Sequence, residues 1–165
     1  MFNIGDKVVY PMHGAGIIEA IEEKEILGES QKYYVMRMPV GDMKVMIPMS
    51  KVDNIGIREI VDEQTITEVM DRLSNGSTDA SNKWNRRYRA NLDKMRSGDI
   101  HDMADVVRCL MLREKEKGLS TGERKMLDNA RQILISELVL AKGMDESKAL
   151  GLLDEIIFSE RKASG

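Results

Sequence analysis

The sequence has few of the residues on which disulfide bonding and membrane insertion depend. Among its 165 residues is one cysteine, so an internal disulfide framework is excluded and a reducing compartment is indicated. Cys109 lies in a run with helical periodicity, where we expect a buried and inert thiol. No stretch approaches the roughly 18 to 20 apolar residues that cross a bilayer, and the first residues carry no apolar signal segment. These absences predict a cytoplasmic protein that does not enter a membrane.

Catalytic and metal-binding motifs are also scarce. The two histidines, His13 and His101, are far apart in the sequence, and neither has a partner at metal-ligand spacing. The sequence contains no phosphate-binding loop of the G-x-x-x-x-G-K-[ST] type, and Gly14-Ala-Gly16 lacks the rest of a dinucleotide fingerprint. We therefore expect no enzyme, no cofactor, no metal and no small-molecule substrate. His101 is interpreted as a solvated residue in the first turn of a helix.

The overall charge is slightly negative. A net charge of −3 and an isoelectric point near 5.5 argue against non-specific adhesion to DNA by the whole molecule. Any contact with nucleic acid must therefore come from a local patch. Length and an apolar fraction of 42% fit one or two small domains with a buried core.

Residues 1–62 alternate in the manner of strands. Glycine, proline and polar residues separate the alternating segments, and Pro48 removes a donor from any continuing strand. This pattern predicts a small, strongly bent antiparallel sheet, with most of the thirteen methionines in the core. The predicted strands are 7–10, 16–21, 31–38 and 42–47, with hairpin connections at 27–30 and 39–42.

Residues 63–165 have helical periodicity, and good start and stop signals mark five helices. The predicted fold class is therefore α+β, with a β domain at 1–62 followed by an all-helical domain at 63–165. Ser120 and Glu123 have capping-box spacing, and Ser81 or Asn82 is expected to cap the second helix. The predicted helices are 64–73, 82–96, 99–117, 120–142 and 145–159, the last with a broad apolar stripe that includes Leu150.

The segment 81–96 concentrates positive charge around the only tryptophan, Trp84. Two interpretations stay open from the residues alone. Helical spacing places Trp84 on one stripe with Tyr88, Leu92 and Met95, which favours a core anchor. Alternatively, the ring extends past the packed body at a helix start and contacts bases while the cations hold phosphates. The charged residues are Lys83, Arg86, Arg87, Arg89, Lys94 and Arg96, against a single Asp93.

Three stretches of the sequence, 2–16, 84–92 and 118–127, resemble the CarD/CdnL family of bacterial transcription regulators, and the similarity covers nearly the whole chain. The opening stretch is also similar to the polymerase-binding domain of the transcription-repair coupling factor. That protein is a helicase, and the missing nucleotide-binding loop removes this identity. The resemblance implies a Tudor-like β domain that binds the RNA polymerase β subunit, and a helical domain at the upstream edge of the transcription bubble.

The resemblance also implies a role for individual residues. The tryptophan that matches Trp84 is a minor-groove wedge, which favours the open promoter complex because it interacts best with distorted DNA. Arg86, Arg87, Arg89 and Arg124 match positions expected to hold the phosphate backbone without reading bases. Promoter specificity then comes from polymerase, to which the factor is tethered.

The polymerase surface departs from the family pattern at one position. Met46 stands where some members have a basic residue, while Lys24 supplies a cation at the other basic position. The contact is therefore expected to be more apolar, with an exposed strand edge as a further means of pairing. The competing interpretation is an adaptor of the transcription machinery without direct DNA contact, in which Trp84 belongs to the core.

Overall fold

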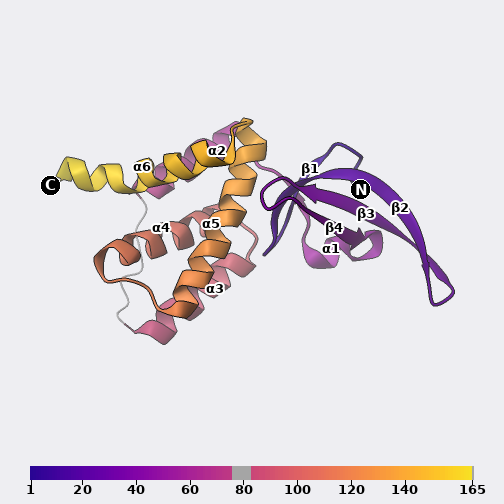
Figure 1. Ribbon diagram of the computed structural model, residues 1–165, viewed down its shortest axis with the longest axis horizontal. Coiled ribbons are helices and arrows are strands. Elements are labelled where there is room, and N and C mark those ends of the chain that lie inside the picture. Colours follow the sequence, from indigo (N-terminus) through magenta and orange to yellow (C-terminus); the bar gives the residue numbers. More distant parts are fainter. Residues whose placement is uncertain (76–82, 165) are drawn as a thin grey trace.

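The computed structural model describes residues 1–75 and 83–164, with side chains described as far as residue 158 (Figure 1). An antiparallel sheet is followed by helices, which confirms the predicted α+β class. The sheet has the order β4-β3-β2-β1-β5, so β4 and β5 form its two edges. The strands are β1 (Lys7–Tyr10), β2 (Gly14–Ile26), β3 (Glu29–Met38), β4 (Met43–Pro48) and β5 (Arg58–Glu59).

The β2–β3 hairpin is longer than predicted and forms an arm that extends away from the helices (Figure 1). Its turn consists of Leu27 and Gly28, with φ angles of 53° and 82°. Two consecutive left-handed residues define a tight two-residue hairpin turn, whose twist matches that of the strands. Three short elements were not predicted: a 3₁₀ turn η1 (Met49–Lys51), α1 (Val52–Ile55) and strand β5.

The two faces of the sheet are covered by different parts of the chain. One face holds a cluster of buried residues, and η1, α1 and the N-terminal segment pack on it. Of the six methionines near the sheet, Met36 and Met38 are buried and Met43 and Met46 are exposed, so the expected core placement is only partly right. The buried cluster consists of Val8, Ile18, Tyr34, Met36, Met38 and Ile47.

The five predicted helices are present, and their ends lie within two residues of the predicted ones except at the C-terminus, where the last helix continues to Ser164, five residues past its predicted end. Ser120 Oγ accepts a hydrogen bond from the Glu123 N–H, and Gly143 ends the same helix in a left-handed conformation. The predicted cap of α3 is wrong in position: Lys83 is the N-cap and gives no side-chain bond, while Ser81 and Asn82 lie outside the described residues. The helices are α2 (Glu63–Asn75), α3 (Trp84–Arg96), α4 (Ile100–Glu116), α5 (Thr121–Lys142) and α6 (Glu146–Ser164).

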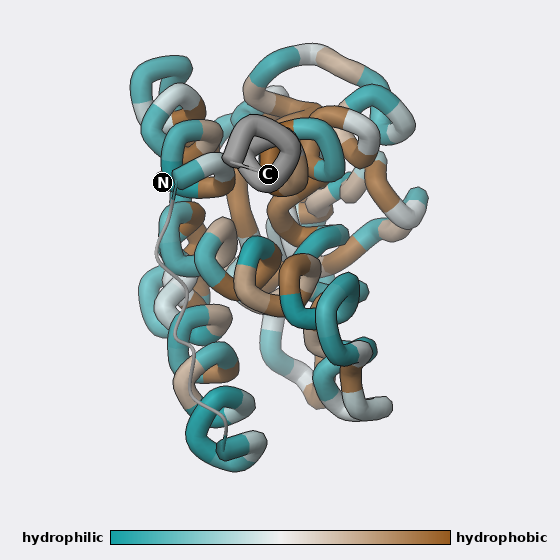
Figure 2. The backbone as a smooth tube through the Cα atoms, turned by 90° about the vertical axis from the view of Figure 1, so that its left-hand side faces the viewer, coloured by the Kyte–Doolittle hydropathy of each residue, from teal (hydrophilic) through white to brown (hydrophobic). Residues whose placement is uncertain are grey.

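The helices enclose one large apolar core, to which each of α2 to α6 contributes buried residues. Figure 2 shows their hydrophobic segments turned toward the interior and their hydrophilic segments toward the outside. On α6 the stripe is narrower than predicted: Ala149, Leu153 and Ile157 are buried, but Leu150 is exposed.

Helix α5 joins the helical part to the sheet, and it packs against β2 (Figure 1). The Ala15 N–H donates to Ser136 Oγ at 2.8 Å, and this bond is buried. A Cβ at Gly14 would lie 2.8 Å from the same oxygen, so only glycine allows the two elements to approach this closely. The switch from strands to helices falls between Glu59 and Glu63; the domain boundary after residue 62 stays a prediction.

Candidate nucleic-acid interface

Trp84 is the first residue of α3 and is 42% exposed. Its ring stacks on Tyr88, one helical turn further on, with 4.9 Å between the ring centroids and 17° between the planes. Its Nε1 donates a hydrogen bond of 2.9 Å to Ser120 Oγ at the start of α5. The ring is thus neither a core anchor, as helical spacing favours, nor a free side chain. The ring is half-exposed, and it is held by stacking on Tyr88 and by the hydrogen bond to Ser120.

The residues beneath this aromatic pair form a buried polar network. Arg87 donates to both carboxylate oxygens of Glu123, with 2.7 Å from Nε and 3.0 Å from Nη2. Their side chains are only 3% and 2% exposed. Burial by itself raises the pKa of Glu123, but the hydrogen bonds and charge of Arg87 outweigh it and leave that pKa below its ordinary value. Glu123 is therefore ionised, as a buried ion pair requires.

This geometry corrects the expectation for Arg87. The sequence groups it with Arg86 and Arg89 as a phosphate contact, but its guanidinium is enclosed between α3 and α5. Hydrogen bonding to Glu123 raises the pKa of Arg87, so its charge is committed to that carboxylate. A buried and paired guanidinium cannot reach the DNA backbone without breaking the fold. Arg87 therefore belongs to the buried network beneath the Trp84–Tyr88 ring pair.

The other predicted cations lie at the surface. Arg86 and Arg89 are exposed and line a shallow hollow on the outer face of α3 together with Asn85, Ala90 and Asp93. Arg124 stands in the first turn of α5 and pairs with Glu114 at 2.7 Å, although the two side chains are 53% and 36% exposed. An exposed pair of this kind contributes little to stability, so Glu114 does not commit the charge of Arg124 as Glu123 commits that of Arg87.

Lys24 and Met46 are both exposed on the sheet and share one face of it. Met46 is 37% exposed and lies opposite Val35, which in turn lies opposite Ala20. Because side chains alternate along a strand, Lys24 points to the same side as Ala20, about 13 Å toward the tip of the arm. Met46 lies on β4, whose outer edge forms no strand pairing within the described residues. Lys24 and Met46 therefore share one face of the sheet, with Met46 at the β4 edge and Lys24 nearer the tip of the arm.

A second ion pair, which sequence reasoning missed, connects the two parts of the chain: its carboxylate is buried and its guanidinium is partly exposed. Arg58 on β5 donates to both oxygens of Glu137 on α5 at 2.8 Å, and Nε of Arg58 donates to the Gly98 carbonyl at 2.9 Å. The Val61 N–H donates to the same Glu137 carboxylate at 3.0 Å. These contacts join strand β5 and the segment after it to α5, and they hold the sheet in one orientation to the helices.

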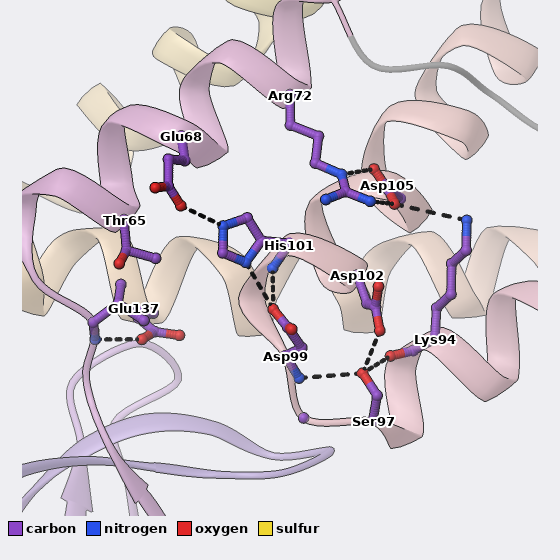
Figure 3. Close-up of polar contacts among 12 residues, drawn as sticks. Thr65, Glu68, Arg72, Lys94, Ser97, Asp99, His101, Asp102, Asp105 and Glu137 are labelled. Carbon is purple, nitrogen blue, oxygen red and sulfur yellow. Dashed lines mark hydrogen bonds and ion pairs between the residues drawn. The ribbon is translucent and has the colours of Figure 1, made fainter.

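His101 is more than the solvated residue that its position suggests. Its ring nitrogens lie 2.9 Å from Asp99 Oδ1 and 3.0 Å from Glu68 Oε2 on α2 (Figure 3). Hydrogen bonding to Asp99 is the main cause that raises the pKa of His101, and Glu68 adds to it. Nearby, Asp105 on α4 pairs with Arg72 at 2.7 Å and Lys94 at 3.7 Å. These contacts connect α4 to α2 and α3.

The described residues hold no candidate metal centre. Residues 1–75 and 83–164 contain no group of three histidine, cysteine or acidic side chains in a metal-binding arrangement. Burial raises the pKa of the Cys109 thiol, which supports the prediction of an inert cysteine. Over the same residues, no helix combines the length and apolar character that a bilayer span requires.

Some of these contacts leave a signal in the sequence and others do not. Trp84 and Tyr88 are four residues apart, so their stacking follows from helical spacing. The capping-box spacing identifies Ser120 as a cap, but nothing in it indicates the bond from the indole. The Arg87–Glu123 and Arg58–Glu137 pairs join residues 36 and 79 positions apart, and they have no local signature.

Comparison with known proteins agrees with this architecture. The family described as "CarD, C-terminal domain" matches residues 68–154, and the family described as "CarD-like/TRCF RID domain" matches residues 2–61. The chain is 51% identical over 148 residues to "Putative transcription factor YdeB" of Bacillus subtilis (strain 168), covering 90% of this chain and 97% of that protein.

A solved structure is also similar, the solution NMR structure of the 72-residue N-terminal domain of Myxococcus xanthus CarD. Sequence identity is 37%, and the match covers 36% of this chain and 79% of that one, with a TM-score of 0.32. The fold assignment rests on the strands and helices described above and not on this likeness. Sheet, helices and matches together define a transcription regulator and not an enzyme. The chain belongs to the CarD family.

Proposed function

We propose that this protein binds the RNA polymerase β subunit through its sheet and promoter DNA through its helices, and that it stabilises the open complex with Trp84 as a minor-groove wedge. The observation that carries the proposal is the half-exposed ring of Trp84, backed by Tyr88 at the start of a cationic helix. Full burial of an indole would contribute more to stability than partial exposure does, so a half-exposed tryptophan is a candidate contact for a partner. An apolar wedge at the edge of melted DNA gains most from the distorted state and shifts the equilibrium toward it.

The charges around the ring support contact with the DNA backbone. The first turn of α3 contains no acidic residue, and its N-cap Lys83 forms no side-chain cap hydrogen bond, so no side chain of that turn offsets the positive end of the helix dipole. Arg86 and Arg89 are exposed on the same helix, and Arg124 stands on the first turn of α5. These cations would fix the position of the wedge on phosphates without reading sequence.

The sheet supplies the tether to polymerase in this proposal. The β4 edge has open main-chain groups for strand addition, and Lys24 and Met46 on one face of the sheet add a cation and an apolar contact. The Arg58–Glu137 pair joins the sheet to α5, the helix whose N-cap Ser120 contacts Trp84. A tethered factor needs little intrinsic affinity for DNA, which fits the net charge of −3.

The central experiment measures the lifetime of the open complex on a promoter fragment with the cognate polymerase. We expect the wild-type protein to lengthen the lifetime and Trp84→Ala, checked for folding by thermal melting, to lose most of this effect. Leu150→Ala is the matched control, because Leu150 is 38% exposed on the distant helix α6. Equal activity of the wild type and Trp84→Ala would exclude the wedge. Polymerase binding without any effect on the lifetime would favour the adaptor.

A second experiment separates the two surfaces. DNA binding by the Arg86→Ala/Arg89→Ala variant should depend less steeply on salt, by roughly 0.9 in the log–log slope for each lost phosphate contact. Polymerase binding should fall for Met46→Glu and persist for Met43→Glu. Met43 is the matched control for Met46, because it is 48% exposed on the same strand but on the opposite face of the sheet.

A further inference from the structure

We propose that Ser120 is a positioning residue for Trp84, which links the orientation of the wedge to the N-terminal cap of α5. The inference rests on the proposed function, since it concerns how the same tryptophan is presented to DNA. Its basis is the hydrogen bond of 2.9 Å from Trp84 Nε1 to Ser120 Oγ, which joins residues 36 positions apart. Stacking on Tyr88 restrains the plane of the ring, and this bond restrains its rotation within that plane.

The acceptor is itself held in place. Ser120 Oγ accepts the Glu123 N–H at 3.2 Å as the N-cap of α5, a helix of 22 residues. A hydroxyl has two lone pairs and one proton, so Oγ can accept both bonds and donate to Glu123 Oε1, which lies 3.4 Å away. The Glu123 carboxylate is buried and paired with Arg87. The indole is thereby connected, through one hydroxyl, to the buried ion pair under α3.

The site is shaped so that the ring lies against the start of α5. A Cβ at Gly122 would lie 3.7 Å from Trp84 Cζ2 and 3.6 Å from Tyr88 Cε2, so both rings border this glycine. The side of the indole with Nε1 and Cζ2 therefore faces α5. A half-exposed ring without this restraint would exchange rotamers and would lose that freedom on insertion between bases. The hydrogen bond to Ser120 restricts the ring before DNA is bound, and so it lowers the entropic cost of insertion.

The first test uses fluorescence of the full chain, because emission from its single tryptophan reports on Trp84 alone. Ser120→Gly removes the acceptor but keeps most of the capping preference, and Ser120→Thr keeps a hydroxyl and serves as the matched control. We expect Ser120→Gly to shift the emission maximum, to increase quenching by acrylamide and to lower the anisotropy, while Ser120→Thr resembles the wild type. Spectra of a folded Ser120→Gly variant that equal those of the wild type would overturn the inference.

The second test is a double-mutant cycle on open-complex lifetime. Trp84→Phe removes the N–H donor without touching the cap, so it also serves if Ser120→Gly folds poorly. We expect Ser120→Gly to shorten the lifetime about two- to twelvefold, the range that one hydrogen bond gives, and to add nothing in the Trp84→Phe background. The same shortening in both backgrounds would show that Ser120 acts only as a cap and would refute the positioning role.

The two tests also separate this inference from the function on which it rests. If Trp84→Ala and Trp84→Phe leave the lifetime unchanged, the wedge itself is refuted. The fluorescence comparison needs neither DNA nor polymerase, so it still decides whether Ser120 holds the ring. If the wedge acts but Ser120→Gly changes neither fluorescence nor lifetime, only the positioning role fails.

Discussion

The ion pair between Arg87 and Glu123 allows a quantitative test of where the arginines of α3 act. Both side chains are almost completely buried, and the carboxylate receives two bonds from one guanidinium. Replacing Arg87 by methionine removes the charge but keeps an unbranched side chain of similar length. It leaves the Glu123 carboxylate buried without its main partner. If Arg87 were instead a surface contact to phosphate, the same change would hardly affect the stability of the free protein.

The expected cost follows from the burial of the pair. Breaking a buried pair by removing one partner costs about 3–5 kcal/mol, because the remaining charge is desolvated without compensation. Arg124–Glu114 provides the comparison, since it has the same shortest distance of 2.7 Å but is largely exposed. Arg124→Met should therefore cost at most about 1 kcal/mol. The two ion pairs have the same shortest distance and differ in burial, so Arg124→Met is the matched control for Arg87→Met.

The assay is equilibrium unfolding in urea at neutral pH, followed by far-ultraviolet circular dichroism. A loss of several kcal/mol is a large part of the about 5–15 kcal/mol that holds a small protein together, so Arg87→Met should unfold at a much lower urea concentration. Adding Glu123→Leu should restore most of the loss, because two apolar residues replace two desolvated charges. Circular dichroism is preferred to tryptophan fluorescence, because Trp84 lies next to the mutated network and its emission would also respond to local changes.

A specific result would refute this reasoning. If Arg87→Met and Arg124→Met had equally small effects on the unfolding free energy, the Arg87–Glu123 pair would not be buried as described. If Arg87→Met then also reduced the salt dependence of DNA binding, Arg87 would be the phosphate contact that the sequence suggests. We expect the folded Arg87→Met protein to keep the wild-type salt slope.

Two further predictions concern the sheet and the helices. Gly16→Ala should lower the melting temperature strongly, because its Cβ would lie 2.5 Å from the Arg37 carbonyl oxygen, and an unchanged melting temperature would contradict the close strand approach. Asp99 and Glu68 raise the folded-state pKa of His101. The imidazolium therefore stabilises the fold fully below the unfolded-state pKa of about 6.5, and this contribution is lost as the pH rises through the raised pKa. The difference in unfolding free energy between wild type and His101→Gln should therefore be larger at pH 6 than at pH 9, and a difference that is constant or grows with pH would refute this assignment.

The order of elements could be predicted from the sequence because its signals are local. Alternation identified the four main strands, and glycine or serine at element ends identified turns and caps. The Ser120 cap and the Gly143 stop act on backbone groups within one or two turns, so their effect is fixed by neighbouring residues. The short elements η1, α1 and β5 escaped prediction because they have too few residues to show a period.

The roles of individual arginines could not be predicted in this way. Arg86 and Arg87 are adjacent and chemically identical, yet one is exposed and the other is buried. The difference depends on which side of α3 meets α5 and on Glu123, which lies 36 positions away in sequence. Trp84 likewise follows the periodicity of a core residue, but the packed body ends before its ring is covered.

The sequence by itself determined the α+β class, the main strands and helices, the caps and the resemblance to the CarD family, because these depend on local backbone preferences and on contiguous motifs. Only the tertiary structure decided which charges are buried, what the Trp84 indole binds and how the sheet is fixed to α5. Those outcomes depend on contacts between residues far apart in the chain. Local propensity carries no information about such partners until the helices have packed.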